Sequence, residues 1–465
     1  MGKIFGTDGI RDRAGQGYLT PAFIERTARA VGGLLRKSPA RFRTPMPALL
    51  RHLKPARGAA ALARGKVLIG RDTRASGPDI EQALARGFEA EGVGVALVGV
   101  TTTPGVACLA RAWGASLGVV ISASHNPAED NGIKFFSPQG FKVPDATEDR
   151  IEKLLEKEAA PARARKKVPR PADLSASGGQ YLDFLAGFCK PLKGMKIVID
   201  CGHGAASALA GPLFERLGAR PIVLNAAPDG LNINAGCGAL HPGGVAEAVR
   251  REKAQMGVAY DGDADRAILV DEGGQIRDGD DVLALCATHL KERKKLPKNK
   301  VVSTVMANFG LERYLAGIGA TLTRTPVGDK YVAEEMIRSG AVIGGEPAGH
   351  ILFFDASTAG DGLLTTLRVL DVLAERGEPL SRLAVAKCPQ VLINVRVGRK
   401  PALDTVPGIQ KALDGVRRAL GSDGRVLVRY SGTENLCRVM VEGTDGALVE
   451  RLARETADTV KKELA

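Results

Sequence analysis

The sequence predicts an α/β protein in which several similar α/β units are followed by a smaller α+β domain. Short runs of β-branched residues alternate with alanine- and leucine-rich segments of helical period, the pattern of layered α/β proteins. The chain has 465 residues, which at about 100–200 residues per domain corresponds to roughly three or four domains. The pattern changes in the last part of the chain, which predicts a domain of a different kind.

Three stretches each predict a strand, then a helix that ends at glycine, then a second strand. The first strands are KVLIG (66–70), KIVID (196–200) and KVVSTV (300–305). The helices that follow are PDIEQALARGFEAEG (78–92), ASALAGPLFERLG (206–218) and FGLERYLAGIG (309–319). This recurrence predicts an internal repeat of similar α/β units.

The last part of the chain predicts a smaller α+β domain. Strands are expected at PQVLINVRVGRK (389–400), GRVLVRYSG (424–432) and NLCRVMVEG (435–443), with a helix at 404–421 and a closing helix. Proline and charge cluster near 160–172, as is typical of a linker. We therefore expect four domains, at residues 1–165, 166–255, 256–372 and 373–465.

The net charge of +13 is concentrated in one stretch. Residues 36–66 contain nine Lys or Arg and no acidic residue. They lack the interleaved aromatic residues of a surface that stacks nucleic-acid bases, so we expect no nucleic-acid partner. We interpret residues 38–62 as a solvated basic insertion in the first domain, with a surface for an anionic partner as the alternative.

Other features of the composition predict a cytoplasmic protein without a membrane partner. No apolar run reaches the roughly 20 residues that cross a bilayer. The seven cysteines have scattered spacings and no CxxC pair, which argues against a disulfide framework. The first residues lack the apolar core of a signal peptide.

The segment GVAYDGDADRAILVD (257–271) predicts a metal site. Asp261, Asp263 and Asp265 follow an apolar strand at alternate positions, so their carboxylates can converge on one hard cation. An EF-hand is excluded because Arg266 stands where the sharp turn of that loop needs glycine. The alternative is a solvated polar turn. Mg²⁺ is favoured, because the ligands are all oxygen and a phosphate could share the site.

Two further loops carry candidate catalytic groups. LGVVISASHNPAEDNGIKFFS (117–137) places Ser124 and His125 after a buried strand, with Lys134 in the next strand. Such strand ends present reactive groups in α/β folds, although a serine that bonds its own turn is the common alternative. AVIGGEPAGHILFFD (341–355) places Glu346 and His350 in a second loop, where they could bind sugar hydroxyls or transfer protons.

The segment VRYSGTENLCRVMVEG (428–443) predicts a phosphate-binding loop. Guanidinium groups, hydroxyls and free backbone N–H groups around a glycine are what a phosphate dianion requires. The residues concerned are Arg429, Ser431, Gly432, Thr433 and Arg438. A hairpin with a polar turn is the alternative.

Taken in order, the motifs resemble those of the α-D-phosphohexomutase family over nearly the whole chain. They are FGTDGIR (5–11), ISASHNP (121–127), DGDADR (261–266), GGEPAGH (344–350) and RYSGTENLCRVMVEG (429–443). The resemblance implies four domains around a central cleft. LNINAGCGALHPGG (231–244) is most similar to family members that act on glucosamine phosphate. Members that act on glucose or mannose phosphate are the alternative.

The family resemblance also implies roles for individual residues. Ser124 would be phosphorylated and, with Asp261, Asp263 and Asp265, would bind one Mg²⁺ per chain. Catalytic roles would fall to Ser124, Arg11, His125, Lys134, Arg266 and His350. The phosphosugar would be bound by Val327, Gly328, Asp329, Glu346, Ala348, Arg429, Ser431, Gly432, Thr433 and Arg438. The implied reaction interconverts glucosamine 6-phosphate and glucosamine 1-phosphate through a 1,6-bisphosphate. A hexosamine 1,6-bisphosphate or a kinase would first phosphorylate the serine. The resemblance is also compatible with a homodimer.

Several positions depart from the usual family pattern. Ala264 replaces a usual glycine, and would strain the metal loop by about 1 kcal/mol or more if its φ is positive. Pro347 and Ala348 stand where a serine is usual at 348, which removes one hydroxyl from the sugar site. Asn435 and Lys330 replace a usual proline and arginine. Because of the changes at Ala264, Pro347 and Ala348, the alternative is a non-catalytic relative that binds phosphosugars.

Overall fold

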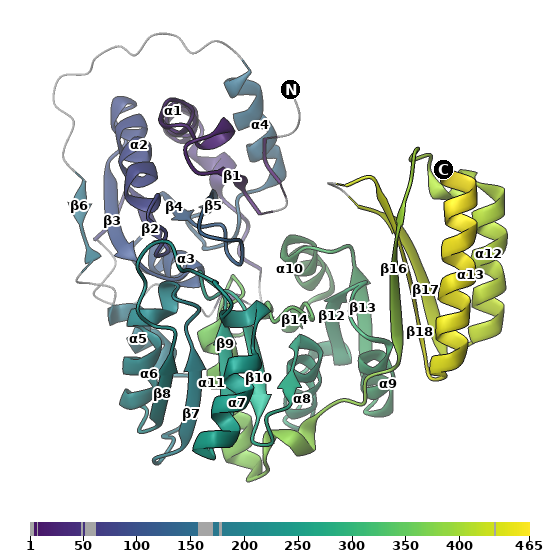
Figure 1. The fold of residues 1–465 in the computed structure, drawn as a ribbon. Coiled ribbons are helices and arrows are strands. Elements are labelled where there is room, and N and C mark those ends of the chain that lie inside the picture. Colours follow the sequence, from purple (N-terminus) through teal and green to yellow (C-terminus); the bar gives the residue numbers. More distant parts are fainter. Residues whose placement is uncertain are drawn as a thin grey trace. The chain divides into compact units, whose positions relative to one another are not determined.

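The computed structural model describes residues 4–6, 8–47, 50–51, 62–156, 171–175, 179–431 and 434–465. The chain divides into two compact units, and Figure 1 labels the helices and strands along the chain. Unit 1 consists of Met1–Val302 and Thr325–Ala384, and unit 2 of Ser303–Arg324 and Val385–Ala465. No helix among the described residues is both long and apolar enough to cross a bilayer.

The first sheet has six strands in the order β1-β5-β4-β2-β3-β6. Strands β2, β3, β4 and β6 run parallel, whereas β5 is antiparallel to both β4 and β1. The strands are β1 (Ile10–Arg13), β2 (Val67–Arg71), β3 (Val95–Val100), β4 (Leu117–Ile121), β5 (Asp130–Phe136) and β6 (Ala172–Asp173). The helices of this part are α1 (Pro21–Lys37), α2 (Gly77–Ala90), α3 (Thr103–Ala112) and α4 (Asp145–Leu155). Strand β4 has only apolar residues and is buried along its whole length, as expected for a strand that is covered on both faces.

The second sheet has five strands in the order β11-β10-β9-β7-β8. They are β7 (Lys196–Asp200), β8 (Arg220–Leu224), β9 (Met256–Tyr260), β10 (Ala267–Asp271) and β11 (Ile276–Arg277), with helices α5 (Gly179–Ala186), α6 (Ala210–Arg216) and α7 (Gly243–Glu252). The domain boundary that the sequence places at 255 is wrong, because β9 pairs directly with β7. The DGDADR loop therefore lies in the second sheet and not in the third domain. The other domain boundaries stay predictions.

The third sheet has the order β13-β12-β14-β15. Its strands are β12 (Lys300–Thr304), β13 (Thr321–Thr325), β14 (Ile343–Gly345) and β15 (Ile351–Phe353). The helices are α8 (Gly279–Glu292), α9 (Phe309–Gly317), α10 (Asp329–Ser339) and α11 (Gly362–Arg376). Residues of β12 and β13 belong partly to unit 1 and partly to unit 2. With the first two sheets, this arrangement confirms the predicted fold class of three mixed α/β domains.

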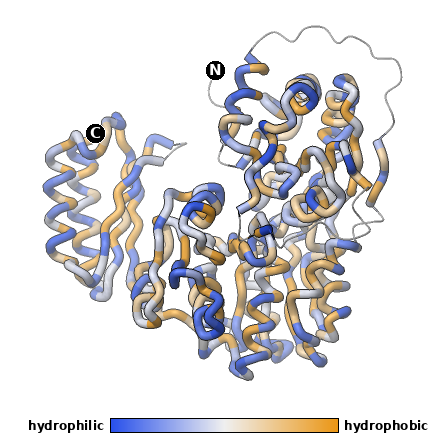
Figure 2. The backbone as a smooth tube through the Cα atoms, turned by 180° about the vertical axis from the view of Figure 1, so that it is seen from behind, coloured by the Kyte–Doolittle hydropathy of each residue, from blue (hydrophilic) through white to orange (hydrophobic). Residues whose placement is uncertain are grey.

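The C-terminal part of unit 2 is the predicted smaller α+β domain. Its antiparallel sheet has the order β16-β18-β17, with β16 (Gln390–Arg396), β17 (Gly424–Tyr430) and β18 (Leu436–Gly443). Helices α12 (Pro407–Leu420) and α13 (Gly446–Leu464) alternate between hydrophilic and hydrophobic residues in Figure 2. Their buried residues, such as Ile409 and Val449, pack with Val439 of the sheet. This is the packing expected of amphipathic helices on one face of a sheet.

Short 3₁₀ helices connect these elements. They are η1 (Gly17–Leu19), η2 (Pro39–Phe42), η5 (Ala205–Ala208), η6 (Gly238–Leu240), η7 (Pro297–Asn299), η8 (Leu380–Leu383) and η9 (Leu403–Thr405). Glycine or proline lies within or directly beside most of them.

In the described part of the basic stretch 38–62 the arginines are exposed, as predicted for a solvated insertion, but two apolar side chains are buried. Phe42 is fully buried in the core of the first sheet. Leu50 is fully buried with Phe141 and Leu352, at the third sheet. The backbone N–H of Thr44 also donates to Gln139 Oε1 at 3.1 Å. Apolar anchors therefore fix this stretch despite its charge, and residues 48–49 and 52–61 lie outside the described part.

Candidate active site

Ser124 lies in the loop between β4 and β5, at the carboxyl end of the first sheet. Its side chain is buried, with 1% of the residue exposed. Its φ of 53° is left-handed, an uncommon conformation for a residue other than glycine. The backbone N–H of Ser124 donates to Ser122 Oγ at 2.9 Å, and Ser122 donates to Asp72 Oδ2 at 2.6 Å. The loop is thus built on a buried polar network of the first sheet.

The Ser124 hydroxyl lies against the acidic loop of the second sheet. It donates to Asp261 Oδ2 at 2.6 Å, across 137 residues of sequence. Its Oγ also lies 3.4 Å from His125 Nδ1. The structure thus brings together the two segments that the sequence analysis selected independently.

Asp261, Asp263 and Asp265 form a compact acidic group between β9 and β10. Each offers one carboxylate oxygen, and these oxygens lie within 4.8 Å of one another. Ala264, in the same turn, has a φ of 54° and is completely buried. The departure from glycine at this position therefore places an alanine in the left-handed region, where strain is expected.

The electrostatics of the acidic group fit a cation. Burial, together with Asp265 and Asp263, raises the pKa of Asp261 well above its usual range. Among the residues that the structure describes, Asp263 Oδ1 and Asp265 Oδ1 are buried without a hydrogen-bond partner. Three buried carboxylates, two of which have an oxygen that accepts no hydrogen bond, are a donor set for a hard divalent ion. The group can therefore hold a metal ion.

Lys134 is the protein's own cation beside this acidic group. Its Nζ lies 2.9 Å from Asp263 Oδ2, 2.9 Å from Asp8 Oδ2 and 3.6 Å from Asp265 Oδ2. Burial opposes the charge on Lys134, but these carboxylates raise its pKa. The ammonium stays charged and offsets part of the negative charge.

Thr103, at the start of α3, supports the acidic group and was missed by sequence reasoning. Its hydroxyl donates to Asp263 Oδ2 at 2.5 Å, and its backbone N–H donates to Asp263 O at 3.0 Å. Threonine at a helix start normally indicates capping, so its type carried no signal of this contact. These two bonds orient the Asp263 carboxylate.

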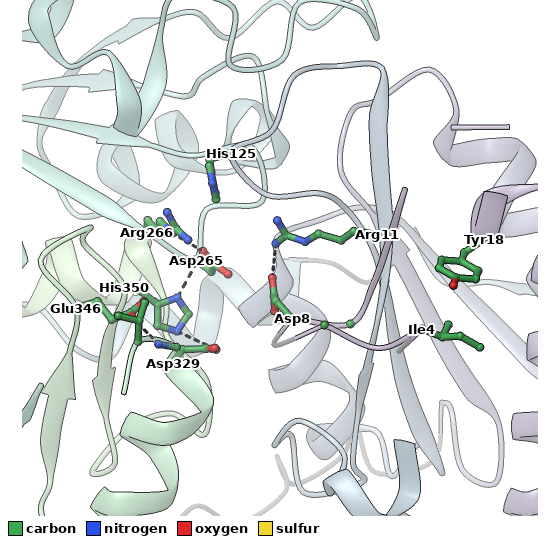
Figure 3. Close-up of a pocket in the computed structure, with 14 residues that line it drawn as sticks. Ile4, Asp8, Arg11, Tyr18, His125, Asp265, Arg266, Asp329, Glu346 and His350 are labelled. Atoms are coloured by element: carbon green, nitrogen blue, oxygen red, sulfur yellow. Dashed lines mark hydrogen bonds and ion pairs between the residues drawn. The ribbon is translucent and has the colours of Figure 1, made fainter. Parts of the chain in front are cut away.

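A pocket of about 430 Å³ in unit 1 opens beside this acidic group (Figure 3). It is lined by residues from the parts of the chain that form all three sheets, and Asp265 belongs to both the acidic group and the lining. The predicted site residues in the lining are Arg11, His125, Asp265, Arg266, Val327, Gly328, Asp329, Glu346 and His350. Ala348 is exposed and does not belong to this lining. The pocket therefore unites nine of the predicted residues.

The two histidines of the pocket hold different charges. His350 lies between Asp265 and Asp329 (Figure 3), with Nδ1 3.5 Å from Asp265 Oδ1 and Nε2 3.6 Å from Asp329 Oδ2. Burial opposes its charge, but these carboxylates raise the pKa of His350 to about 9. Burial together with Arg266 and Arg11 lowers the pKa of His125 to about 4. At neutral pH His350 is a proton donor and His125 is an acceptor.

Asp8 and Lys142 connect the catalytic candidates across the pocket, and sequence reasoning missed both. Asp8 pairs with Arg11 at 2.5 Å and with Lys142 at 2.6 Å. Lys142 also lies 2.7 Å from Asp329 Oδ2. Glu346 Oε1 accepts a bond of 3.0 Å from the Gly328 N–H. Asp329 is thus held by charge in the lining of the pocket.

The predicted phosphate loop lies in unit 2, between β17 and β18. Arg429 and Arg438 are directly opposite each other in this antiparallel pair, where two like charges repel. Burial and Arg438 both lower the pKa of Arg429. The Ser431 N–H donates to Leu436 O at 2.9 Å, while Gly432 and Thr433 lie outside the described residues. Two opposed guanidinium groups favour an anion between them.

Comparison with protein families identifies all four predicted parts. The family models for phosphoglucomutase/phosphomannomutase match as domain I over residues 47–162, domain II over 179–274, domain III over 278–391 and the C-terminal domain over 392–459. The chain belongs to the phosphoglucomutase/phosphomannomutase family. The match to domain II includes the DGDADR loop, in agreement with its place in the second sheet.

Individual members of the phosphoglucomutase/phosphomannomutase family are similar over full length. The phosphoglucosamine mutase of Anaeromyxobacter sp. (strain Fw109-5) is 46% identical over 475 residues, covering 99% of this chain and 96% of its own. That of Symbiobacterium thermophilum is 45% identical and covers 100% of both chains. The crystal structure of a family protein from Burkholderia thailandensis is 25% identical, with a TM-score of 0.78 over 99% of this chain and 97% of its own. The predicted resemblance is confirmed.

Proposed function

We propose that the chain is an enzyme that interconverts glucosamine 6-phosphate and glucosamine 1-phosphate through a phosphorylated Ser124. The observation that carries the proposal is the 2.6 Å bond between the Ser124 hydroxyl and Asp261, within a group of three buried carboxylates. The named activity of relatives 45–46% identical over full length supports the choice of amino sugar. In this reaction phosphorylated Ser124 gives its phosphoryl group to one sugar oxygen, which forms a 1,6-bisphosphate. The bisphosphate then returns its other phosphoryl group to Ser124.

The cation that we propose for the site is one Mg²⁺ per chain. Asp261, Asp263 and Asp265 would hold it, together with an oxygen of the phosphorylated Ser124. When bound, Mg²⁺ supplies positive charge that offsets the charge of the phosphoryl group. The all-oxygen donor set and the buried Asp263 Oδ1, which accepts no hydrogen bond, support this assignment.

Basic groups around the pocket are suited to the transferred phosphoryl group. Arg11 and Arg266 line the pocket, and Lys134 lies buried beside the acidic group. Phosphoryl transfer depends mainly on positioning and on stabilising charge over the phosphoryl oxygens. We assign this task to these three side chains. His125 is neutral and can accept a hydrogen bond from the sugar or the serine.

His350 is our candidate for the proton shuttle. As its pKa of about 9 keeps it protonated at neutral pH, it can give a proton to the oxygen that loses a phosphoryl group. In the same transfer the imidazole takes up the proton that the attacking hydroxyl releases, so that His350 ends protonated again. Asp265 and Asp329 keep the imidazolium in place.

The remaining residues would bind the substrate. Glu346, with Val327 and Gly328, would contact the sugar hydroxyls. Arg429, Ser431 and Arg438 would hold the non-reacting phosphate, with Gly432 and Thr433 beyond the described residues. The phosphate loop has to accept either end of the bisphosphate, because the sugar turns over between the two transfers. A bisphosphate sugar or a kinase would supply the first phosphoryl group.

The location that we propose is the cytoplasm. All seven cysteines are free, and four of them are buried. Free thiols persist in a reducing compartment.

Turnover of hexose 6-phosphates measured in parallel tests the proposed function. We expect glucosamine 6-phosphate to be converted faster than glucose 6-phosphate or mannose 6-phosphate, and activity to be lost when EDTA removes the metal. Faster turnover of mannose or glucose 6-phosphate would show that the chain is a phosphomannomutase or phosphoglucomutase instead. No turnover of any of the three, with Ser124 unmodified, would leave only phosphosugar binding.

A further inference from the structure

Two backbone carbonyls of the Ser124 loop are each held by two donors. The carbonyl oxygen of Ser124 accepts from Arg74 Nη2 at 3.0 Å and from Asn234 Nδ2 at 2.9 Å. The carbonyl oxygen of Asn126 accepts from the same two nitrogens, at 2.9 Å and 3.0 Å. A carbonyl has two lone pairs, so both acceptors are filled.

The first donor, Arg74, follows β2 and belongs to the same sheet as the loop. It is completely buried. Its Nε donates to Asp72 at 2.9 Å, and its Nη1 donates to Pro127 O and to Asp130 O. All five of its N–H groups are thus engaged, and Arg74 fixes the loop from within the first sheet.

The second donor, Asn234, comes from the second sheet. It lies in the segment that follows β8, and its backbone N–H donates to Gly202 O at 2.9 Å. The same amide also faces the metal loop. A Cβ at Gly262 would lie 3.0 Å from Asn234 Nδ2 and 2.6 Å from Ser124 O. The Asn234 amide is therefore packed where the serine loop and the metal loop meet.

Ser124 needs such support because its backbone is left-handed. A non-glycine residue keeps that conformation only where its surroundings fix it. A small rotation of the loop would move Oγ away from Asp261. Within the residues that the structure describes, Asn234 is the side chain that joins the Ser124 carbonyl to the second sheet.

We propose that Asn234 is a positioning residue for phosphoryl transfer. Its amide holds the Ser124 loop in register with the metal loop, so that the serine oxygen faces Asp261. The inference rests on the proposed function, because it assumes that Ser124 carries the phosphoryl group.

This role differs from a contribution to stability. Without the Asn234 amide, each carbonyl still accepts from Arg74, so no buried acceptor is left without a donor. Asn234 is also only partly buried. Its loss therefore frees the loop without unfolding the domain.

The experiment compares Asn234→Ala and Asn234→Asp with the control Asn232→Ala. Asn232 lies two residues away, and within the described residues its side chain bonds only to its own loop, at Ala227 O and the Asp229 N–H. The measurements on the whole chain are kcat and KM for glucosamine 6-phosphate, the rate of Ser124 phosphorylation by glucose 1,6-bisphosphate followed by intact mass, amide exchange of residues 122–131, and the thermal midpoint.

We expect Asn234→Ala to lower kcat and the phosphorylation rate by about 10- to 100-fold, with KM within about twofold, because misplacement acts on the chemical step. Amides of residues 122–131 should exchange about tenfold faster. Asn234→Asp should be worse, because its carboxylate repels the two carbonyls. The thermal midpoint should stay within about 2 °C in Asn234→Ala, and Asn232→Ala should match the wild type throughout.

Four outcomes would overturn the inference. A wild-type kcat and wild-type exchange in Asn234→Ala would show that Arg74 alone positions the loop. Equal losses in Asn234→Ala and Asn232→Ala, with a lower thermal midpoint in both, would reduce the role to stability. If the wild type itself takes up no phosphoryl group, the proposed function fails and the inference with it. If the wild type takes it up and Asn234→Ala does so equally fast, the inference alone fails.

Discussion

The Ser124 hydroxyl donates a 2.6 Å hydrogen bond to Asp261, although the two residues are 137 positions apart in the chain. The bond connects the loop after β4 in the first sheet to the loop after β9 in the second. Asp261 is fully buried, and burial with its acidic neighbours raises its pKa. The Ser124 hydroxyl therefore lies where a phosphoryl group on it would be close to three buried carboxylates. A metal ion held by these carboxylates would offset the negative charge of the phosphoryl group.

Replacing Ser124 with alanine should remove both the phosphorylation and the mutase activity. The oxygen that carries the phosphoryl group is lost, so turnover of glucosamine 6-phosphate should fall by at least about 1000-fold. After incubation with glucose 1,6-bisphosphate, intact-mass measurement should show a gain of about 80 Da for the wild type and none for Ser124→Ala. Ser422→Ala, in an exposed turn of unit 2, is the control. A mass gain in Ser124→Ala would assign the phosphoryl group to another residue.

Replacing Thr103 with valine should weaken metal binding. The variant keeps the shape of the side chain but removes the hydroxyl that donates to Asp263 Oδ2. Loss of such an orienting bond typically costs 10- to 100-fold in metal affinity, so we expect the Mg²⁺ concentration for half-maximal activity to rise by about tenfold or more. Thr103→Ser keeps the donor and should restore most of the affinity. An unchanged Mg²⁺ dependence in Thr103→Val would show that the backbone bond alone orients Asp263.

Replacing Gly262 with alanine should separate the serine loop from the metal loop. The new Cβ would lie 2.6 Å from Ser124 O and 2.7 Å from Ile233 Cδ1. The first of these is backbone held by two donors, so it cannot move freely. We expect kcat to fall by about 100-fold and the free energy of unfolding to fall by about 1–3 kcal/mol. Both are measured by steady-state kinetics and urea denaturation.

Gly244→Ala is the matched control for this change. Gly244 lies in the first turn of α7, and its Cβ would meet no atom within 4 Å in the described structure. Alanine should therefore be neutral there, or stabilising by about 0.5–1 kcal/mol. If Gly262→Ala behaved like Gly244→Ala, the two loops would not be in the tight contact that the structure gives them.

The sequence predicted the catalytic groups that lie in contiguous motifs. Ser124 and the three aspartates follow apolar strands, and the carboxyl ends of strands in an α/β fold present their side chains to one site. The φ of Ala264 was also open to prediction, because a glycine position in a tight turn favours the left-handed region. The alternation of β16, β17 and β18 gave the C-terminal domain.

The supporting residues could not be predicted, because their contacts are long-range. The bond from Thr103 to Asp263 spans 160 residues, and the bond from Asn234 to Ser124 spans 110. Neither residue type has a local pattern that indicates such a contact. The hairpin β9–β10 was assigned to the wrong domain, since its apolar strands fit either sheet equally well. The burial of Phe42 and Leu50 was not predicted either, because the positive charge of the basic stretch indicated exposure of the whole segment.

Asp361 predicts a pH dependence of stability. It caps α11 by accepting from the Leu364 N–H at 2.9 Å, and it accepts from the Tyr181 hydroxyl at 2.7 Å. Burial raises its pKa from 3.8 to about 6, despite these two bonds. A raised pKa means that the folded state prefers the protonated acid. The stabilisation is therefore complete below about pH 4 and is lost as the pH rises towards 6 and above.

Replacing Asp361 with asparagine should remove this loss. Asparagine is neutral at every pH, its Oδ1 can cap the helix, and its Nδ2 can donate to the Tyr181 oxygen. Relative to the wild type, the variant should gain up to about 3 kcal/mol in the free energy of unfolding between pH 4 and pH 7. Urea denaturation in EDTA across this range measures the difference. Asp183→Asn, on the exposed surface of α5, controls for removal of a charge. A difference between Asp361→Asn and the wild type that stays constant with pH would mean that Asp361 does not titrate in this window.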